Sequence, residues 1–181
     1  VTPRLWTVAY LRQNEIMADV EIAAFVTALQ ELLREAYLEP GGAGYTWFAD
    51  EDPQGGFITA IEALSAEEAS RRAYPGSDSV AAHCNHLAYH LSLANRSFQG
   101  ENAFAEADWP RSWEIQEVNE SGWKLIREQL AVELDRCLGI LGRLDNLAEP
   151  MMLRGAMALL AHGAWHLGAV KQLIPMVKVP E

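Results

Sequence analysis

The chain has 181 residues, of which 50% are hydrophobic, and it carries a formal net charge of −11. A chain of this length can bury about 70% of the surface that its unfolded form exposes, so we expect a single domain over residues 1–181. The negative charge argues against a nucleic-acid partner and against an anionic membrane surface, because both attract cationic proteins.

The cysteines and the apolar segments indicate the cellular compartment of the protein. The only two cysteines, Cys84 and Cys137, are too few for a disulfide framework and are typical of a reducing compartment. The N-terminal residues contain no long apolar signal segment, and no apolar run approaches the ~18 residues of a membrane-spanning helix. We therefore expect a cytoplasmic protein with no membrane partner.

The first predicted long helix covers about 17–38, where apolar residues recur with helical spacing and Pro40 follows as a stop signal. A short helix is expected near 57–64. The sequence from Ser65 to Glu68 is typical of a capping box, which predicts one further short helical turn.

The second long helix is predicted for 78–98, with Ser77 or Ser79 as its N-cap. The segment 101–121 shows no sustained period, so we expect it to be a loop.

A third long helix is predicted for 122–144 and a fourth from Pro150 to about residue 173, ending before Pro175. Four helices of about twenty residues with apolar stripes predict an all-α fold, a four-helix bundle. The long segments after the first and second helices favour at least one crossover connection over simple hairpins.

All the histidines lie in two short windows of the predicted second and fourth long helices: His83, His86, His90, His162 and His166. Residues four apart share one face of a helix, so each HxxxH pair directs two imidazoles towards one point. Buried imidazoles need polar partners, and a metal ion satisfies several at once. This pattern favours a metal site over the alternative, a group of hydrogen-bonded core histidines.

Several other metal and nucleophile sites are excluded by the residues that are missing. Gly163 follows His162 where a zinc protease of the HExxH type needs Glu. No Glu stands three residues before any His, as a di-iron bundle requires. Cys84 is two residues from His86 on the same helix and so faces elsewhere, which predicts a core or surface-edge residue rather than a reactive thiol.

The spacing alone leaves open which histidine of the second long helix completes the site. His162 and His166 lie on or beside the apolar stripe of the fourth helix, so both should face the core. His83, His86 and His90 all flank the stripe of the second helix, with His83 and His90 slightly more central than His86.

Two segments resemble the DinB-like superfamily, bacterial four-helix bundles with a three-histidine metal site. SDSVAAHCNHLAYHLSLANRSFQGE is similar to its second-helix motif, and LAHGAWHLGAVKQLI is similar to its fourth-helix motif. Carried over by position, the resemblance implies that His86, His162 and His166 are the metal ligands. His90 is then the reserve ligand, and His83 is a structural residue or one that supports a ligand.

The resemblance has two departures and several functional implications. Asp78 stands where the family often has Trp, and Leu167 stands where it has a basic residue. The resemblance implies Zn²⁺ or Ni²⁺ as the metal and a homodimer as the assembly. It further implies a small-molecule substrate, such as a low-molecular-weight thiol, handled by a transferase, isomerase or hydrolase.

Three functions remain open from the sequence. An enzyme with an open three-histidine site would use the ion to acidify a bound water or thiol. A non-enzymatic, stress-related binding protein would use the metal structurally, as a fourth ligand such as His90 would favour. A helical interaction module would hold no metal. The sequence names no catalytic base, although Asn85, Tyr89 and Trp165 lie near the predicted ligands and could line a pocket.

Overall fold

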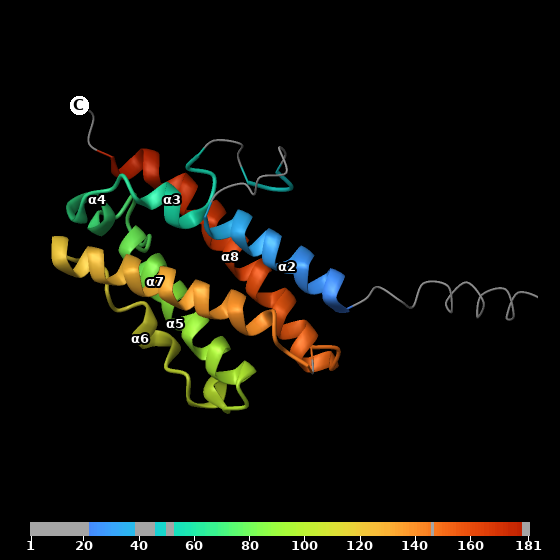
Figure 1. Cartoon of the computed structure of the whole chain (residues 1–181). Helices are drawn as coiled ribbons and strands as arrows, with labels where there is room; N and C mark the ends of the chain where they lie inside the picture. The colour runs from blue at the N-terminus through green and yellow to red at the C-terminus, as the bar shows by residue number, and fades with distance from the viewer. Residues whose placement is uncertain (1–21, 39–45, 50–52, 146, 179–181) are drawn as a thin grey trace, which may run out of the picture.

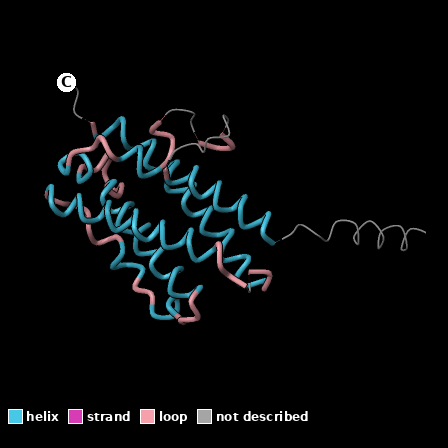
Figure 2. Tube along the Cα trace, in the orientation of Figure 1, coloured by secondary structure: helices cyan, strands magenta, loops and turns pink. Residues whose placement is uncertain are grey.

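The structure is a computed structural model that describes residues 22–38, 46–49, 53–145 and 147–178. Every regular element in these ranges is a helix, which confirms the all-α prediction (Figures 1 and 2). The described helices include none with the length and apolar character that crossing a bilayer requires. The long ones are α2 (Ile22–Tyr37), α5 (Val80–Phe98), α7 (Glu120–Leu141) and α8 (Pro150–Val177).

The predicted long helices are present, with shifted ends. Ser79 caps α5 by accepting a hydrogen bond from the N–H of Ala82. Asn119 caps α7, which therefore starts two residues before the predicted position. Helix α8 continues through Pro175, because a proline in the last turn removes only one backbone N–H from the helix. The predicted start of the first helix and its stop signal lie outside the described residues.

The shorter helices confirm one prediction and correct another. Helix α3 covers Phe57–Ile61, and α4 (Ala66–Ser70) begins with the predicted capping box. The segment 101–121 is not a plain loop, because it contains a 3₁₀ turn at Ala103–Glu106 and helix α6 (Trp109–Ser112). Elements of a single turn are too short to show a helical period in the sequence.

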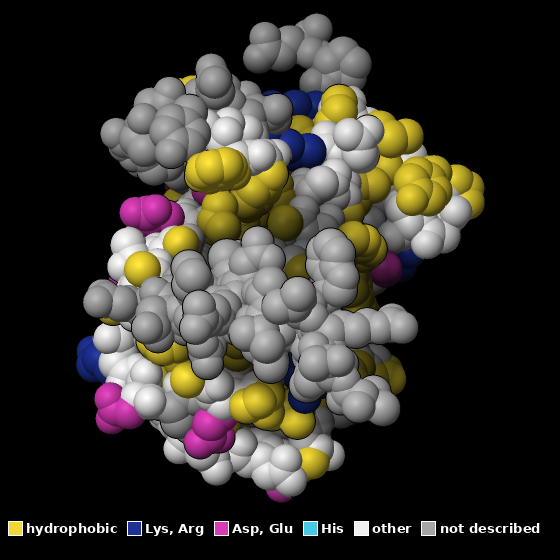
Figure 3. All heavy atoms as spheres, turned by 90° about the vertical axis from the view of Figure 1, so that its right-hand side faces the viewer, with side chains coloured by type: hydrophobic (Ala, Val, Ile, Leu, Met, Phe, Trp, Pro, Cys, Tyr) yellow, Lys and Arg dark blue, Asp and Glu magenta, His cyan; other side chains and the backbone are white. Residues whose placement is uncertain are grey.

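Helix α5 is the central element of the described part. It packs along α7 on one side and against α8 on another, while α2 packs against α8. Between these helices lies an apolar core whose largest fully buried side chains include Trp123, Tyr37, Phe57, Leu33 and Ile61. One outer face carries further apolar side chains among scattered acidic and basic ones (Figure 3).

A close contact fixes α8 against α2 beside the histidines. Gly163 lies against the ring of Tyr37, so closely that a Cβ atom at this position would overlap that ring. Tyr37 is fully buried and cannot move into solvent. Because Gly163 faces α2, the neighbouring His162 and His166 on α8 can face α5.

Candidate metal centre

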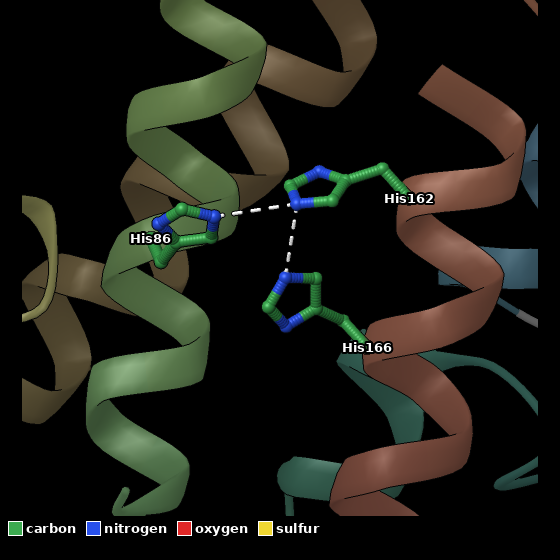
Figure 4. A group of neighbouring side chains, drawn as sticks. All are labelled: His86, His162 and His166. Atoms are coloured by element: carbon green, nitrogen blue, oxygen red, sulfur yellow. Dashed lines mark hydrogen bonds between the residues drawn. The ribbon is translucent and has the colours of Figure 1, made fainter. Parts of the chain in front are cut away.

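The five histidines come together between α5 and α8, and we call them the histidine cluster: His83, His86 and His90 from α5, with His162 and His166 from α8. Three of them form a tighter group in which each offers a ring nitrogen, and these nitrogens all lie within 4.8 Å of one another: His86, His162 and His166. Figure 4 shows these three side chains pointing towards one another across the gap between the helices. They are close enough to bind one metal ion.

The inner nitrogens have the spacing that a metal site needs. Nε2 of His162 lies 3.3 Å from Nε2 of His86 and 3.1 Å from Nε2 of His166. Two nitrogen ligands of a tetrahedral ion, with bonds of about 2.0–2.1 Å, lie about 3.3 Å apart. Both nitrogen pairs that involve His162 therefore lie close to the separation that a shared ion imposes, and the third pair lies within 4.8 Å.

The outer nitrogen of His86 has a hydrogen bond that defines its tautomer. Its Nδ1 lies 2.8 Å from the hydroxyl oxygen of Ser112. That hydroxyl donates its proton to the backbone carbonyl of Trp109, at 2.6 Å. The Ser112 oxygen is then the acceptor and His86 Nδ1–H is the donor, so Nε2 of His86 keeps a free lone pair towards the other two rings.

The outer nitrogens of the α8 pair face the remaining two histidines. His166 Nδ1 lies 2.8 Å from Nδ1 of His83, and His162 Nδ1 lies 3.0 Å from Nδ1 of His90. If His162 and His166 present Nε2 lone pairs to an ion, their Nδ1–H groups donate to His90 and His83. The structure thus places His83 and His90 as hydrogen-bond partners of two predicted ligands and outside the group of three.

Burial keeps the cluster neutral at pH 7. Burial first, and the neighbouring histidines second, lower the pKa of His166 to about 2, that of His90 to about 3 and that of His86 to about 4. Burial also lowers the pKa of His83 and His162, while the Asp78 carboxylate acts in the opposite direction on the pKa of His83. Neutral imidazole is the form that binds metal.

Two tryptophan rings, Trp109 and Trp113, pack against the histidine cluster. The sequence did not predict this contact. Trp113 stacks on His86 with 4.2 Å between ring centroids, and Trp109 lies 6.0 Å from both His86 and His90. These rings and Ser112 come from the segment expected to be a loop. The signal that could have indicated this contact was the sequence WPRSW, in which the serine lies between two tryptophans.

The three pocket candidates near the predicted ligands have different surroundings. Trp165 lies edge-on to His166, with 4.6 Å between ring centroids, and lines a cleft beside the cluster. Asn85 donates a hydrogen bond to the Ser112 carbonyl, and the Tyr89 hydroxyl accepts one from the N–H of Asp108. Asn85 and Tyr89 therefore anchor the α6 segment, and both line a second cleft of about 600 Å³ on that side.

The cysteines take no part in the centre. Both are buried and free, which places Cys84 in the core, one of the two positions that the sequence left open for it. Burial raises the pKa of the Cys137 thiol to about 12, and it raises the pKa of Cys84 as well. A protonated thiol is a poor nucleophile at neutral pH, and neither cysteine belongs to the group of side chains that could hold an ion.

Comparison of the chain with protein-family models, curated proteins and solved structures finds no significant match.

Proposed function

We propose that the protein binds one divalent metal ion, Zn²⁺ or Ni²⁺, through His86, His162 and His166, and that it is a metal-dependent enzyme. One observation carries the proposal: the inner nitrogens of these three rings converge while each outer nitrogen has a hydrogen-bond partner. A core of merely structural histidines has no need for three imidazoles aimed at a single point.

The division of the cluster favours a catalytic site over a structural one. Structural zinc sites have four protein ligands, whereas catalytic sites have three and an open position. His83 and His90 turn their Nδ1 atoms to the outer nitrogens of two predicted ligands, and neither belongs to the group of converging nitrogens, which supports an open fourth position. A bound ion at such a site supplies Lewis-acid chemistry by lowering the pKa of a water or thiol in the open position.

The residues around the ligands would hold the site ready. Ser112, His90 and His83 orient the three rings through their outer nitrogens. The stacked ring of Trp113 limits the access of water to His86 and His166, which are nearly or fully buried. Rings held in this way need little rearrangement when an ion binds.

We further propose that the protein belongs to the DinB-like superfamily, which its two histidine-containing segments resemble. In that case the long helices form a DinB-like four-helix bundle with crossover connections, and the protein is a cytoplasmic homodimer that uses a low-molecular-weight thiol or another small molecule. The packing of α5 against α7 and α8, and of α2 against α8, supports a bundle. The placement of both quoted motifs on adjoining helices supports the ligand assignment.

A second candidate is a protein whose metal only joins helices, in a stress-related binding role. The predicted ligands lie on α5 and α8, so an ion would cross-link two helices far apart in the sequence. The cluster itself contains no carboxylate that could serve as a general base, which also fits this candidate. Turnover separates the two functions.

The experiment starts with untagged protein, because a His tag would bind metal itself. Elemental analysis should find about one Zn or Ni per chain, and the metal-loaded protein should then be screened with small thiols and electrophilic acceptors. Turnover that disappears with chelation supports the enzyme. Full metal content without turnover in any thiol or water reaction supports the structural candidate, and metal-free protein that cannot be loaded contradicts both.

A further inference from the structure

A cleft of about 400 Å³ lies beside the histidine cluster, between the start of α5, the residues that follow α6 and the second half of α8. This volume is in the range of small-molecule binding sites. Six of the lining side chains carry the argument: Tyr74, Asp78, His83, Trp113, Trp165 and Gln172.

Aromatic rings dominate the walls of this cleft. Trp165 is 61% exposed and Tyr74 is 55% exposed, although both are large side chains that a protein normally buries. Trp113 is half-buried and stands edge-on to His83, with 5.2 Å between ring centroids. Exposed aromatic rings that converge on a concave site are typical of ligand binding.

His83 connects this cleft to the predicted metal ligands. Its Nδ1 faces Nδ1 of His166, and if it accepts a hydrogen bond from the Nδ1–H of His166, the proton of neutral His83 resides on its Nε2. Within the described ranges, Nε2 of His83 has no hydrogen-bond partner, and His83 lines the cleft. An acceptor atom on a bound molecule can accept a hydrogen bond from this Nε2–H group.

The charges around the cleft select for a neutral molecule. Among the residues that the structure describes, Asp78 is the single charged one that lines the cleft, and no Lys or Arg does so. The carboxylate disfavours an anion, and a divalent ion on the far side of His83 would disfavour a cation. The aromatic rings of the cleft, the free Nε2–H donor of His83 and this charge balance together indicate which kind of ligand fits.

We propose that this cleft binds a neutral aromatic small molecule with a carbonyl or ring-nitrogen acceptor that meets Nε2–H of His83. Its use as the substrate site of the metal centre and its rejection of cations depend on the proposed function, whereas the binding of a neutral aromatic molecule does not. The Gln172 amide offers a second polar contact at the same wall.

The test is a titration of metal-loaded and metal-free protein with benzamide, followed by NMR of the indole and backbone N–H signals. Benzoate, benzylamine and cyclohexanecarboxamide each change one property: the first two add charge, and the third removes the aromatic ring. Saturable benzamide shifts at Trp113, Trp165 and His83, with at least about tenfold weaker binding of the other three probes to the metal-loaded protein, support the proposal. Equal binding of all four probes overturns it.

Variants locate the site. Trp165→Ala should weaken benzamide binding about tenfold, while Trp47→Ala, which removes an even more exposed tryptophan that does not line the cleft, should leave it unchanged. His83→Phe keeps a ring but removes the donor, so it should also weaken benzamide binding. Equal effects of the two tryptophan variants, or an unaffected His83→Phe protein that folds normally, contradict the assignment.

The two proposals fail separately. Benzamide shifts at the cleft of a protein that cannot be loaded with metal support the cleft and contradict the metal centre. A protein that holds one metal ion per chain but shows no benzamide shifts supports the metal centre and contradicts the cleft.

Discussion

The hydroxyl oxygen of Ser112 lies 2.8 Å from Nδ1 of His86 and accepts a hydrogen bond from its N–H, because the Ser112 hydroxyl itself donates to the Trp109 carbonyl. A residue of the one-turn helix α6 thus determines the tautomer of a histidine on α5. With Nδ1 protonated, His86 presents the free lone pair of Nε2 to His162.

Replacing Ser112 by Ala should weaken metal binding by roughly 10- to 100-fold, which is the usual effect of removing a hydrogen-bond partner of a ligand. Competition with a chromophoric chelator measures the change. Ser92→Ala is the matched control, because the Ser92 hydroxyl also donates to the carbonyl three residues earlier but meets no histidine. Equal affinities of the two variants for metal would show that Ser112 does not orient a ligand.

Removal of the metal should lower the melting temperature. An ion that binds only the folded state stabilises it by about 2.7 kcal/mol at a hundredfold excess over its dissociation constant. Calorimetry with chelator, and again after Zn²⁺ or Ni²⁺ is restored, measures this linkage. A melting temperature that does not respond to either treatment, in protein of verified metal content, would contradict binding to the folded state.

The metal-free protein should lose stability as the pH falls below about 6.5. Unfolded histidines titrate near that value, whereas burial lowers the pKa of His86 to about 4, that of His90 to about 3 and that of His166 to about 2. Between these values and 6.5 the unfolded state binds more protons, so the free energy of unfolding decreases with decreasing pH.

Urea unfolding of the metal-free protein at pH 7.5, 6.5 and 5.5 measures this dependence. Each histidine that is neutral only in the folded state contributes up to about 1.4 kcal/mol per pH unit. The His166→Asn variant removes one such group, so its stability should vary less with pH. The same pH dependence in both proteins would mean that His166 is not held neutral by the fold.

Gly163→Ala should destabilise the protein by about 1–3 kcal/mol, because the added methyl group overlaps the fully buried ring of Tyr37. Gly168→Ala on the same helix is the control, since its new Cβ would meet no atom within 4 Å. That substitution should stabilise α8 by up to about 1 kcal/mol. Urea unfolding compares the two, and an equal change in both would contradict the close packing of α8 on α2.

The sequence predicted the long helices and the convergence of two histidine windows because both depend on the helical period. It left the third member of the group open, since His83, His86 and His90 flank one stripe within a narrow angle. The packing of α8 against α5 decides between them, and that packing depends on contacts such as Gly163 with Tyr37.

The α6 segment could not be predicted in the same way. One helical turn gives no periodic pattern, and the position of Ser112 against His86 depends on contacts with α5 that lie far apart in the sequence. The tautomer of His86 follows from that contact, so this part of the site becomes visible only in the folded chain.

The most direct test of the metal centre is the metal content of five single His→Ala variants, measured on untagged protein under the same loading conditions. His86→Ala, His162→Ala and His166→Ala should each fall far below one ion per chain, because each removes one of three ligands. His83→Ala and His90→Ala should remain close to one ion per chain, with weaker affinity. If His90→Ala loses as much metal as His86→Ala, the site is closed by four protein ligands. Full metal content in all five variants would contradict the metal centre.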